Sequence, residues 1–218
     1  MTSEIEKKPK VAIIGLGNIG QVVAANLARN NRPVILANRT SEKATKLAAK
    51  LGRLARATDI ASAIMDTEII VLAIWFSEIK DFLKKYNSEL QGKIIIDPSN
   101  PIAPDKTGGF TKTIGENESA GIFHSAYLPK ESKLVKALGT LGAATLENAS
   151  NQKPAKVLFY ANDETSISGL IDELIRDCGF EPFRVGSIDQ SIRLEVFGEL
   201  HEFGALGKAV TLSDVPKL

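Results

Sequence analysis

Short apolar runs alternate along the chain with amphipathic segments. The runs predict buried strands, because strands of a parallel sheet are covered on both faces and are therefore continuously hydrophobic. They lie near residues 10–15, 33–37, 53–55, 69–74, 93–97, 133–138 and 156–160. Apolar positions three and four residues apart predict helices near 18–30, 41–51, 59–64, 77–86, 119–127, 141–148, 164–178 and 188–203. This alternation predicts an α/β fold with a Rossmann-type, doubly wound, mostly parallel sheet and a small C-terminal α/β unit.

The turn after the first strand carries a glycine motif. Gly15, Gly17 and Gly20 have the Gly-x-Gly-x-x-Gly spacing, with Leu16, Asn18 and Ile19 between them, and they stand between a strand and a helical pattern. In that context the turn presents backbone amides and a helix N-terminus to a pyrophosphate. The alternative is that the glycines serve only the packing of helix on strand.

The end of the second strand indicates which dinucleotide is bound. An NAD-specific site usually places an acidic residue there to accept a hydrogen bond from the ribose hydroxyl. This chain has Asn38, Arg39 and Thr40 instead, with Lys43 one turn into the next helix. A guanidinium and an ammonium suit a 2′-phosphate, which predicts NADP(H). The alternative is that Thr40 or Ser41 caps the helix while Arg39 is merely solvated.

Residues that follow the fourth and fifth strands should line the same crevice, because ligands bind at the carboxyl ends of parallel strands. Ala73, Ile74 and Trp75 follow the fourth strand, and Asn100 and Pro101 follow the fifth. Asn100 is the polar candidate beside the nicotinamide; the alternative is a turn that only directs the chain. Trp75 is interpreted in two ways: it packs against a ligand or a lid over the site, or it is an aromatic residue of the core. The proline- and glycine-rich segment 97–118 is expected to form a loop over the site, and its closure on ligand binding is left open.

Composition excludes several classes of protein. Lys plus Arg number 27 and Asp plus Glu 26, so net charge gives no reason to expect nucleic acid or an anionic membrane as a partner. The longest apolar run, 69–76, is too short to span a bilayer, and residues 1–9 lack the apolar core of a signal peptide. The lone Cys178 fits a reducing compartment, and we expect a cytoplasmic enzyme. The expected organisation is a flexible tail over 1–9, a dinucleotide-binding domain over 10–130 and the small unit over 131–218.

Taken together, these motifs resemble the NADPH-dependent coenzyme F420 reductase family, the F420-dependent NADP oxidoreductases. The likeness extends from about residue 10 to about 212. Besides the glycine turn and the Asn38-Arg39-Thr40 segment, it rests on Asp97-Pro-Ser-Asn-Pro101, Val135-Lys-Ala-Leu-Gly-Thr140, Gly179-Phe-Glu-Pro, Leu194-Glu195 and Gly204-Ala-Leu-Gly207. The resemblance implies a Rossmann fold, a homodimer, and hydride transfer between NADP(H) and a deazaflavin that lies over the nicotinamide.

The resemblance also implies particular contacts. It places Leu16 to Ile19 at the pyrophosphate, Asn38, Arg39 and Lys43 at the 2′-phosphate, and Ile74, Asn100 and Ala137 beside the nicotinamide. Leu138, Gly139, Thr140, His201, Leu206 and Gly207 would bind the acceptor. The chain departs from the family at Leu138-Gly139-Thr140, where many members have Phe-Asn-Thr or a triplet containing histidine. The acceptor is therefore left open between coenzyme F420 and an ordinary flavin, FMN or FAD.

Direct hydride transfer to a stacked ring needs orientation and exclusion of water rather than an acid or base, so no catalytic side chain is expected. The two histidines, His124 and His201, lack cysteine partners and ligand spacing, and no metal is expected. His124 is interpreted mainly as a helix residue whose hydrogen-bonding groups are satisfied within the protein, and His201 as part of the wall of the acceptor pocket.

Two other functions remain open. One is reduction of a small imine or ketone, and the other is an NADP-binding sensor or scaffold without turnover.

Overall fold

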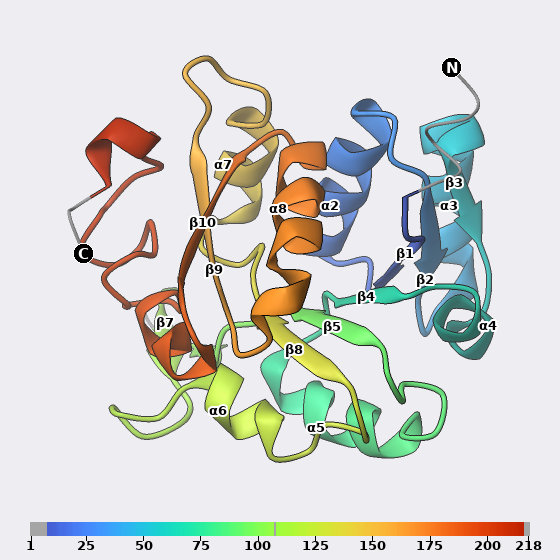
Figure 1. The fold of residues 1–218 in the computed structure, drawn as a ribbon, viewed down its shortest axis with the longest axis horizontal. Coiled ribbons are helices and arrows are strands. Elements are labelled where there is room, and N and C mark those ends of the chain that lie inside the picture. Colours follow the sequence, from blue (N-terminus) through green and yellow to red (C-terminus); the bar gives the residue numbers. More distant parts are fainter. Residues whose placement is uncertain (1–7, 107, 216–218) are drawn as a thin grey trace.

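A single sheet runs through the whole protein. The computed structural model describes residues 8–106 and 108–215, and its main sheet has eight strands in the order β10-β9-β8-β5-β4-β1-β2-β3 (Figure 1). The strands are β1 Val11–Ile14, β2 Val34–Ala37, β3 Ala55–Ala57, β4 Ile69–Leu72, β5 Ile94–Asp97, β8 Lys133–Lys136, β9 Val157–Asn162 and β10 Glu181–Gly186. Neighbours from β3 to β8 pair in parallel, whereas β9 runs antiparallel to β8 and pairs in parallel with β10.

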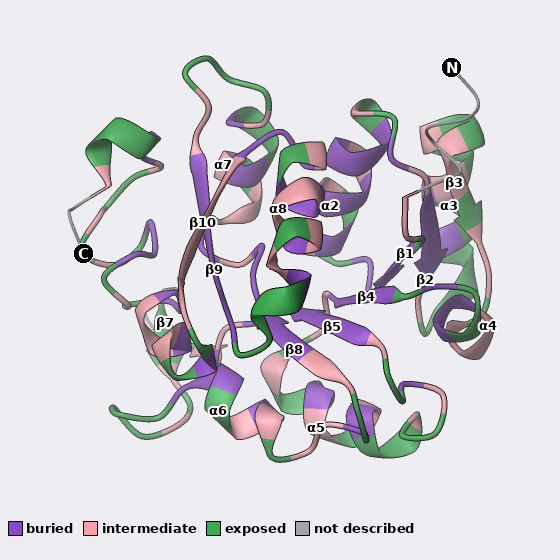
Figure 2. Ribbon diagram, viewed as in Figure 1, coloured by how far each residue is buried: buried purple, intermediate pink, exposed green. Residues whose placement is uncertain are grey.

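Helices cover both faces of the sheet (Figure 1). They are α2 Asn18–Arg29, α3 Ser41–Leu51, α4 Ile60–Met65, α5 Phe76–Lys85, α6 Ala120–Ser125, α7 Ala143–Asn148 and α8 Ser168–Asp177. Alternate residues of each strand face opposite sides. Val11 and Ile13 of β1 belong to the apolar cluster under α2, α3, α7 and α8, while Ala12 and Ile14 belong to the cluster under α4 and α5. Figure 2 shows the central strands as buried along their whole length, as expected for a sheet covered on both faces.

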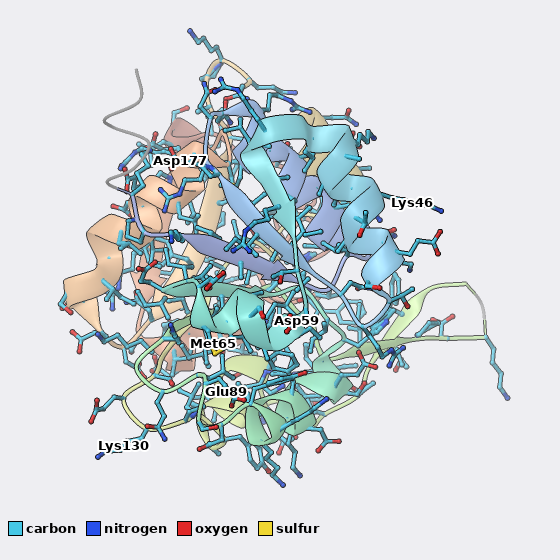
Figure 3. All side chains as sticks on the ribbon, turned by 90° about the vertical axis from the view of Figure 1, so that its right-hand side faces the viewer. Lys46, Asp59, Met65, Glu89, Lys130 and Asp177 are labelled. Atoms are coloured by element: carbon cyan, nitrogen blue, oxygen red, sulfur yellow. The ribbon has the colours of Figure 1, made fainter. Side chains whose placement is uncertain are left out.

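The structure confirms the predicted fold class and corrects several predicted elements. The strand expected at 53–55 is a 3-10 turn at Gly52–Leu54 followed by β3. Strand β10 was not among the predicted strands. The loop over 97–118 contains a small antiparallel hairpin, β6 Ile102–Pro104 and β7 Phe110–Lys112, which extends away from the body of the molecule in Figure 3.

The helix predicted over 188–203 is also wrong. A 3-10 helix covers Ile188–Arg193, and irregular turns follow it. Phe197 has φ 74°, which ends any regular helix, and a Cβ on Gly198 would overlap the Ile192 carbonyl oxygen. Leu194 and Leu200 pack with Val157 and Phe159 of β9. Tertiary contacts with the sheet therefore decide the course of this segment.

The N-terminal part of the described chain is joined to α8. Lys8 Nζ lies 2.8 Å from Asp177 Oδ1, and the buried Arg32 guanidinium donates to Asp177 Oδ2 (2.8 Å) and to the Pro9 carbonyl oxygen (2.6 Å). Figure 3 labels Asp177 beside the start of the described chain. Of the tail expected over 1–9, residues 1–7 lie outside the described residues. Residues of the two expected units, 10–130 and 131–218, share one sheet through the pairing of β5 with β8.

Two features are absent from the described residues. None of the helices in 8–106 and 108–215 is both long and apolar enough to cross a bilayer. Within the same ranges, no three or more His, Cys, Asp and Glu side chains are grouped so that they could hold a metal ion.

Candidate functional site

A cavity of about 820 Å³ lies at the carboxyl ends of the parallel strands. This is the edge at which doubly wound sheets bind their ligands. Its walls come from the segments that follow β1, β2, β4, β5 and β8, from α5, and from the irregular C-terminal segment. The predicted site residues that line it are Gly15, Leu16, Gly17, Asn18, Ile19, Asn38, Arg39, Thr40, Lys43, Ala73, Ile74, Trp75, Asn100, Gly139 and His201.

The three motif glycines have different structural roles. Gly15 has φ +92°, a conformation that side-chain-bearing residues rarely adopt. A Cβ on Gly20 would overlap the Gly15 carbonyl oxygen, so this glycine permits the close packing of α2 on the turn. Gly17 is the N-cap of α2, with φ −77°, and a Cβ there would meet no atom within 4 Å. The space beside Gly17 opens into the cavity, where the helix N-terminus offers unpaired amides to an anion.

The segment after β2 brings two cationic side chains to the site. Arg39, Thr40 and Lys43 all line the cavity. Thr40 is the N-cap residue of α3, but its side chain makes no capping hydrogen bond, so the alternative of a purely capping hydroxyl is not supported. Asn38 accepts a hydrogen bond from the Leu16 amide (3.1 Å) and donates one to the Thr40 carbonyl oxygen (3.1 Å). Its amide therefore ties the glycine turn to β2 and is engaged within the protein.

The turns after β4 and β5 form the next wall. Trp75 is 58% exposed and lines the cavity, which corrects the alternative of a core aromatic. The Asn100 amide donates to the Gly139 carbonyl oxygen (3.2 Å) and accepts from the Val196 amide (2.8 Å). Because both of its polar ends have protein partners, Asn100 joins three wall segments. Ser99, which was not among the predicted site residues, lines the cavity, and its buried hydroxyl has no hydrogen-bond partner among the described residues.

A buried ionic network lies behind this wall. The Asp97 carboxylate accepts hydrogen bonds from the Ser99 amide (2.7 Å) and from His124 Nδ1 (2.9 Å), and Lys136 Nζ lies 3.4 Å from it. Lys136 also donates to the Ser99 carbonyl oxygen. Burial alone would raise the pKa of Asp97, but Lys136 and His124 hold it well below its usual range. His124 is fully buried and does not line the cavity, consistent with its interpretation as a satisfied helix residue.

The C-terminal segment is fixed to the turn after β8. His201 Nε2 lies 3.0 Å from the Gly139 carbonyl oxygen, and His201 Nδ1 accepts from the Phe203 amide (3.0 Å). This pattern requires a neutral ring with its proton on Nε2. Burial lowers the pKa of His201 to about 4, which also favours the neutral ring. The Glu202 carboxylate accepts from the Gly142 amide.

His201 gives a pH-dependence prediction. Because its pKa falls from 6.5 to about 4 on folding, the unfolded chain binds more protons than the folded protein in this interval. We therefore expect the free energy of unfolding to decrease as pH is lowered from 6.5 towards 4, and to decrease less in His201→Gln. Urea unfolding of both proteins at several pH values checks this. Equal pH slopes in the two proteins would contradict the assignment.

The remaining predicted site residues do not line the cavity. Ala137, Leu138 and Thr140 are buried behind it, and Leu206 packs beside the apolar cluster of β9. Gly20 packs against the glycine turn. The full set is Gly20, Pro101, Ala137, Leu138, Thr140, Leu206 and Gly207. Their contact with a ligand stays a prediction.

Sequence reasoning also missed part of the wall. Ser99, Ile102, Phe110, Val196 and Phe203 line the cavity, and none was a predicted site residue. Phe110 is 47% exposed and Phe203 is 59% exposed. Phe110 lies in a segment without periodicity and Phe203 at the end of a predicted helix. Neither position carries a sequence signal that separates a cavity wall from a core, so only the structure identifies these residues.

Comparisons with known proteins agree with this geometry. Residues 10–101 match the family model described as NADP oxidoreductase, coenzyme F420-dependent. The F420-dependent NADP reductase of Methanocaldococcus jannaschii is 26% identical over 201 residues, which cover 88% of this chain and 90% of that protein. The metalloreductase STEAP3 of Rattus norvegicus is 25% identical over 194 residues, which cover 88% of this chain and 37% of that protein.

Solved structures share the fold. A hypothetical protein from Sinorhizobium meliloti superposes with a TM-score of 0.81 at 23% identity, covering 97% of this chain and 99% of the other. An imine reductase from Bacillus cereus gives a TM-score of 0.58 at 19% identity, covering 83% of this chain and 55% of that enzyme. The expectations of a Rossmann-type fold and of an NADP-dependent oxidoreductase are confirmed. The resemblance to the coenzyme F420-dependent NADP oxidoreductases is therefore confirmed as a similarity, with the family model matching residues 10–101.

Proposed function

We propose that this protein transfers a hydride between NADP(H) and a flavin-like ring, either the deazaflavin of coenzyme F420 or the isoalloxazine of FMN or FAD. The observation that carries the proposal is one cavity with two chemically different ends. One end has the glycine turn and the cations after β2. The other has exposed aromatic side chains, and its histidine, His201, is engaged in hydrogen bonds with backbone atoms.

The dinucleotide end fits NADP(H). The volume that a side chain at position 17 would occupy is free, which leaves room for a pyrophosphate against the N-terminus of α2. Arg39 and Lys43 lie where the adenosine ribose of a dinucleotide in this crevice would place its 2′-phosphate. When bound, the nicotinamide supplies or accepts the hydride.

The other end fits a planar acceptor. Phe110 and Phe203 come from the hairpin and from the C-terminal segment, and both line the cavity. Ile102 and Val196 line it as well. Aromatic and aliphatic walls suit a flat heterocycle and exclude water from the position at which a hydride would pass.

The side chains at this end would orient the reactants and would not move protons. His201, the histidine among the described lining residues, has both ring nitrogens in hydrogen bonds to backbone atoms. Lys136 and His124 lie behind the wall in the network around Asp97. Reduction of an imine or ketone calls for a proton donor beside the substrate, whereas transfer to a ring that takes its proton from water needs none. This difference favours a flavin-like acceptor.

Acceptor trials test the proposal. Purified protein is mixed with NADPH and with coenzyme F420, FMN, FAD, a cyclic imine or no acceptor, and NADPH oxidation is followed. We expect oxidation with at least one of the three flavin-like acceptors and none above background with the imine. Turnover of the imine alone would replace this function with a small-molecule reductase. NADPH binding without turnover on any acceptor would favour the sensor or scaffold.

Arg39→Ala tests the 2′-phosphate site. Loss of a charged hydrogen bond is expected to weaken NADPH binding by about 1.5–3 kcal/mol and to leave NADH binding almost unchanged. Trp75 is the only tryptophan of the chain and lines the cavity, so its fluorescence can report both dissociation constants. Equal losses for the two cofactors would remove the assignment.

A further inference from the structure

Arg39 has an ion-pair partner on another wall of the cavity. Its Nη1 lies 3.5 Å from Oε1 of Glu78, and both residues line the cavity. Arg39 belongs to the segment after β2, whereas Glu78 is in the first turn of α5, which follows β4. The pair therefore bridges two walls of the dinucleotide end.

We propose that Glu78 is a specificity-determining residue whose carboxylate competes with the 2′-phosphate of NADP(H) for Arg39. The proposal rests on the proposed function, because it takes the 2′-phosphate to be the ligand of Arg39. In the free protein Glu78 holds the guanidinium; when NADP(H) binds, the phosphate displaces it. Glu78 thus lowers the affinity for NADP(H) and leaves the affinity for NAD(H), which has no such phosphate, unchanged.

The exposure of the pair sets the size of the effect. The Arg39 side chain is 89% exposed and that of Glu78 is 48% exposed. Exposed ion pairs contribute little stability, so a phosphate can displace Glu78 at small cost. A phosphate accepts two parallel hydrogen bonds from one guanidinium, and it carries more charge than a carboxylate. The 2′-phosphate should therefore displace Glu78 from Arg39, but NADP(H) should bind less tightly than it would without Glu78.

Neighbouring charges offer a matched control. Glu42 of α3 stands next to Lys43 in sequence, and its Oε1 lies 2.6 Å from Lys46 Nζ, on a side chain that is also exposed. Glu42 does not line the cavity. Glu42→Gln removes the same charge as Glu78→Gln, but from α3, the helix that follows Arg39 in sequence, and the ion-pair partner of Glu42 is Lys46 and not Arg39.

The experiment measures NADPH and NADH dissociation constants for wild type, Glu78→Gln, Glu42→Gln, Arg39→Ala and the double variant Arg39→Ala/Glu78→Gln. Glu78→Gln is expected to tighten NADPH binding by about two- to fivefold, the range of an exposed ion pair, and to leave NADH binding unchanged. The gain should shrink as salt is added, because exposed charges are screened. It should also be smaller when Arg39 is absent, and Glu42→Gln should give less than half of it.

Each remaining outcome has one meaning. Unchanged or weaker NADPH binding in Glu78→Gln overturns the competition, and so does equal tightening for NADPH and NADH or an equal gain from Glu42→Gln. A gain that persists in full without Arg39 also overturns it. If the wild-type protein does not prefer NADPH to NADH, the NADP(H) assignment of the proposed function fails instead.

Discussion

Gly17→Val is expected to abolish NADPH binding while the protein still unfolds cooperatively. Gly17 has φ −77° and ψ −163°, which is extended backbone open to any residue, and its Cβ would meet no protein atom within 4 Å. The valine methyl groups would instead occupy the space into which the pyrophosphate must fit. We expect the dissociation constant to rise by at least about 100-fold, or about 2.8 kcal/mol. Isothermal titration and thermal unfolding measure the two effects separately.

Gly20→Val is the matched control for this prediction. The same substitution three residues later would drive a Cβ into the Gly15 carbonyl oxygen, so it should lower the unfolding temperature together with binding. Near wild-type NADPH affinity in Gly17→Val would show that the pyrophosphate does not lie against the helix N-terminus.

Lys136→Met is expected to have the largest effect on stability. It leaves the fully buried carboxylate of Asp97 without the cation that lies 3.4 Å away, and it removes the donor to the Ser99 carbonyl oxygen. Breaking a buried ion pair from one side costs about 3–5 kcal/mol, a large part of the about 5–15 kcal/mol that stabilises a typical protein. Urea unfolding at neutral pH measures the loss.

Acid-induced unfolding provides a second measurement on the Lys136→Met variant. Asp97 has a folded-state pKa below its ordinary 3.8, so its contribution is present above that pH and is lost as pH falls. Without Lys136 the pKa of Asp97 should rise, and acid unfolding should begin at a higher pH.

Lys46→Met serves as the control. This side chain is 75% exposed, forms an ion pair with Glu42 on its own helix, and extends into solvent from α3 in Figure 3. Its substitution should cost no more than about 0.5 kcal/mol. A similarly small loss for both variants would contradict a stabilising role of the buried network.

Local sequence alone determined the dinucleotide half of the protein. The strands β1, β2, β4 and β5 are apolar runs, and the glycine spacing fixes the turn between β1 and α2. These features depend on residues that are close together in the chain. A short apolar run and a glycine turn can therefore be recognised without knowing which distant segments pack against them. The position of Arg39 and Lys43 just after β2 likewise predicts that both line the crevice, as they do.

Tertiary structure decided the C-terminal wall of the cavity. Segment 188–203 has helical periodicity, yet its leucines pack on β9, and Asn100, His201 and Glu202 fix its path through backbone contacts 60 or more residues away in sequence. The hydrogen bond from the Val196 amide also engages Asn100 within the protein, and the contact of Asn100 with a ligand stays a prediction. A side chain's partner depends on which distant segments meet it. Periodicity and spacing therefore determine elements and local turns, whereas the C-terminal wall of the cavity follows only from packing.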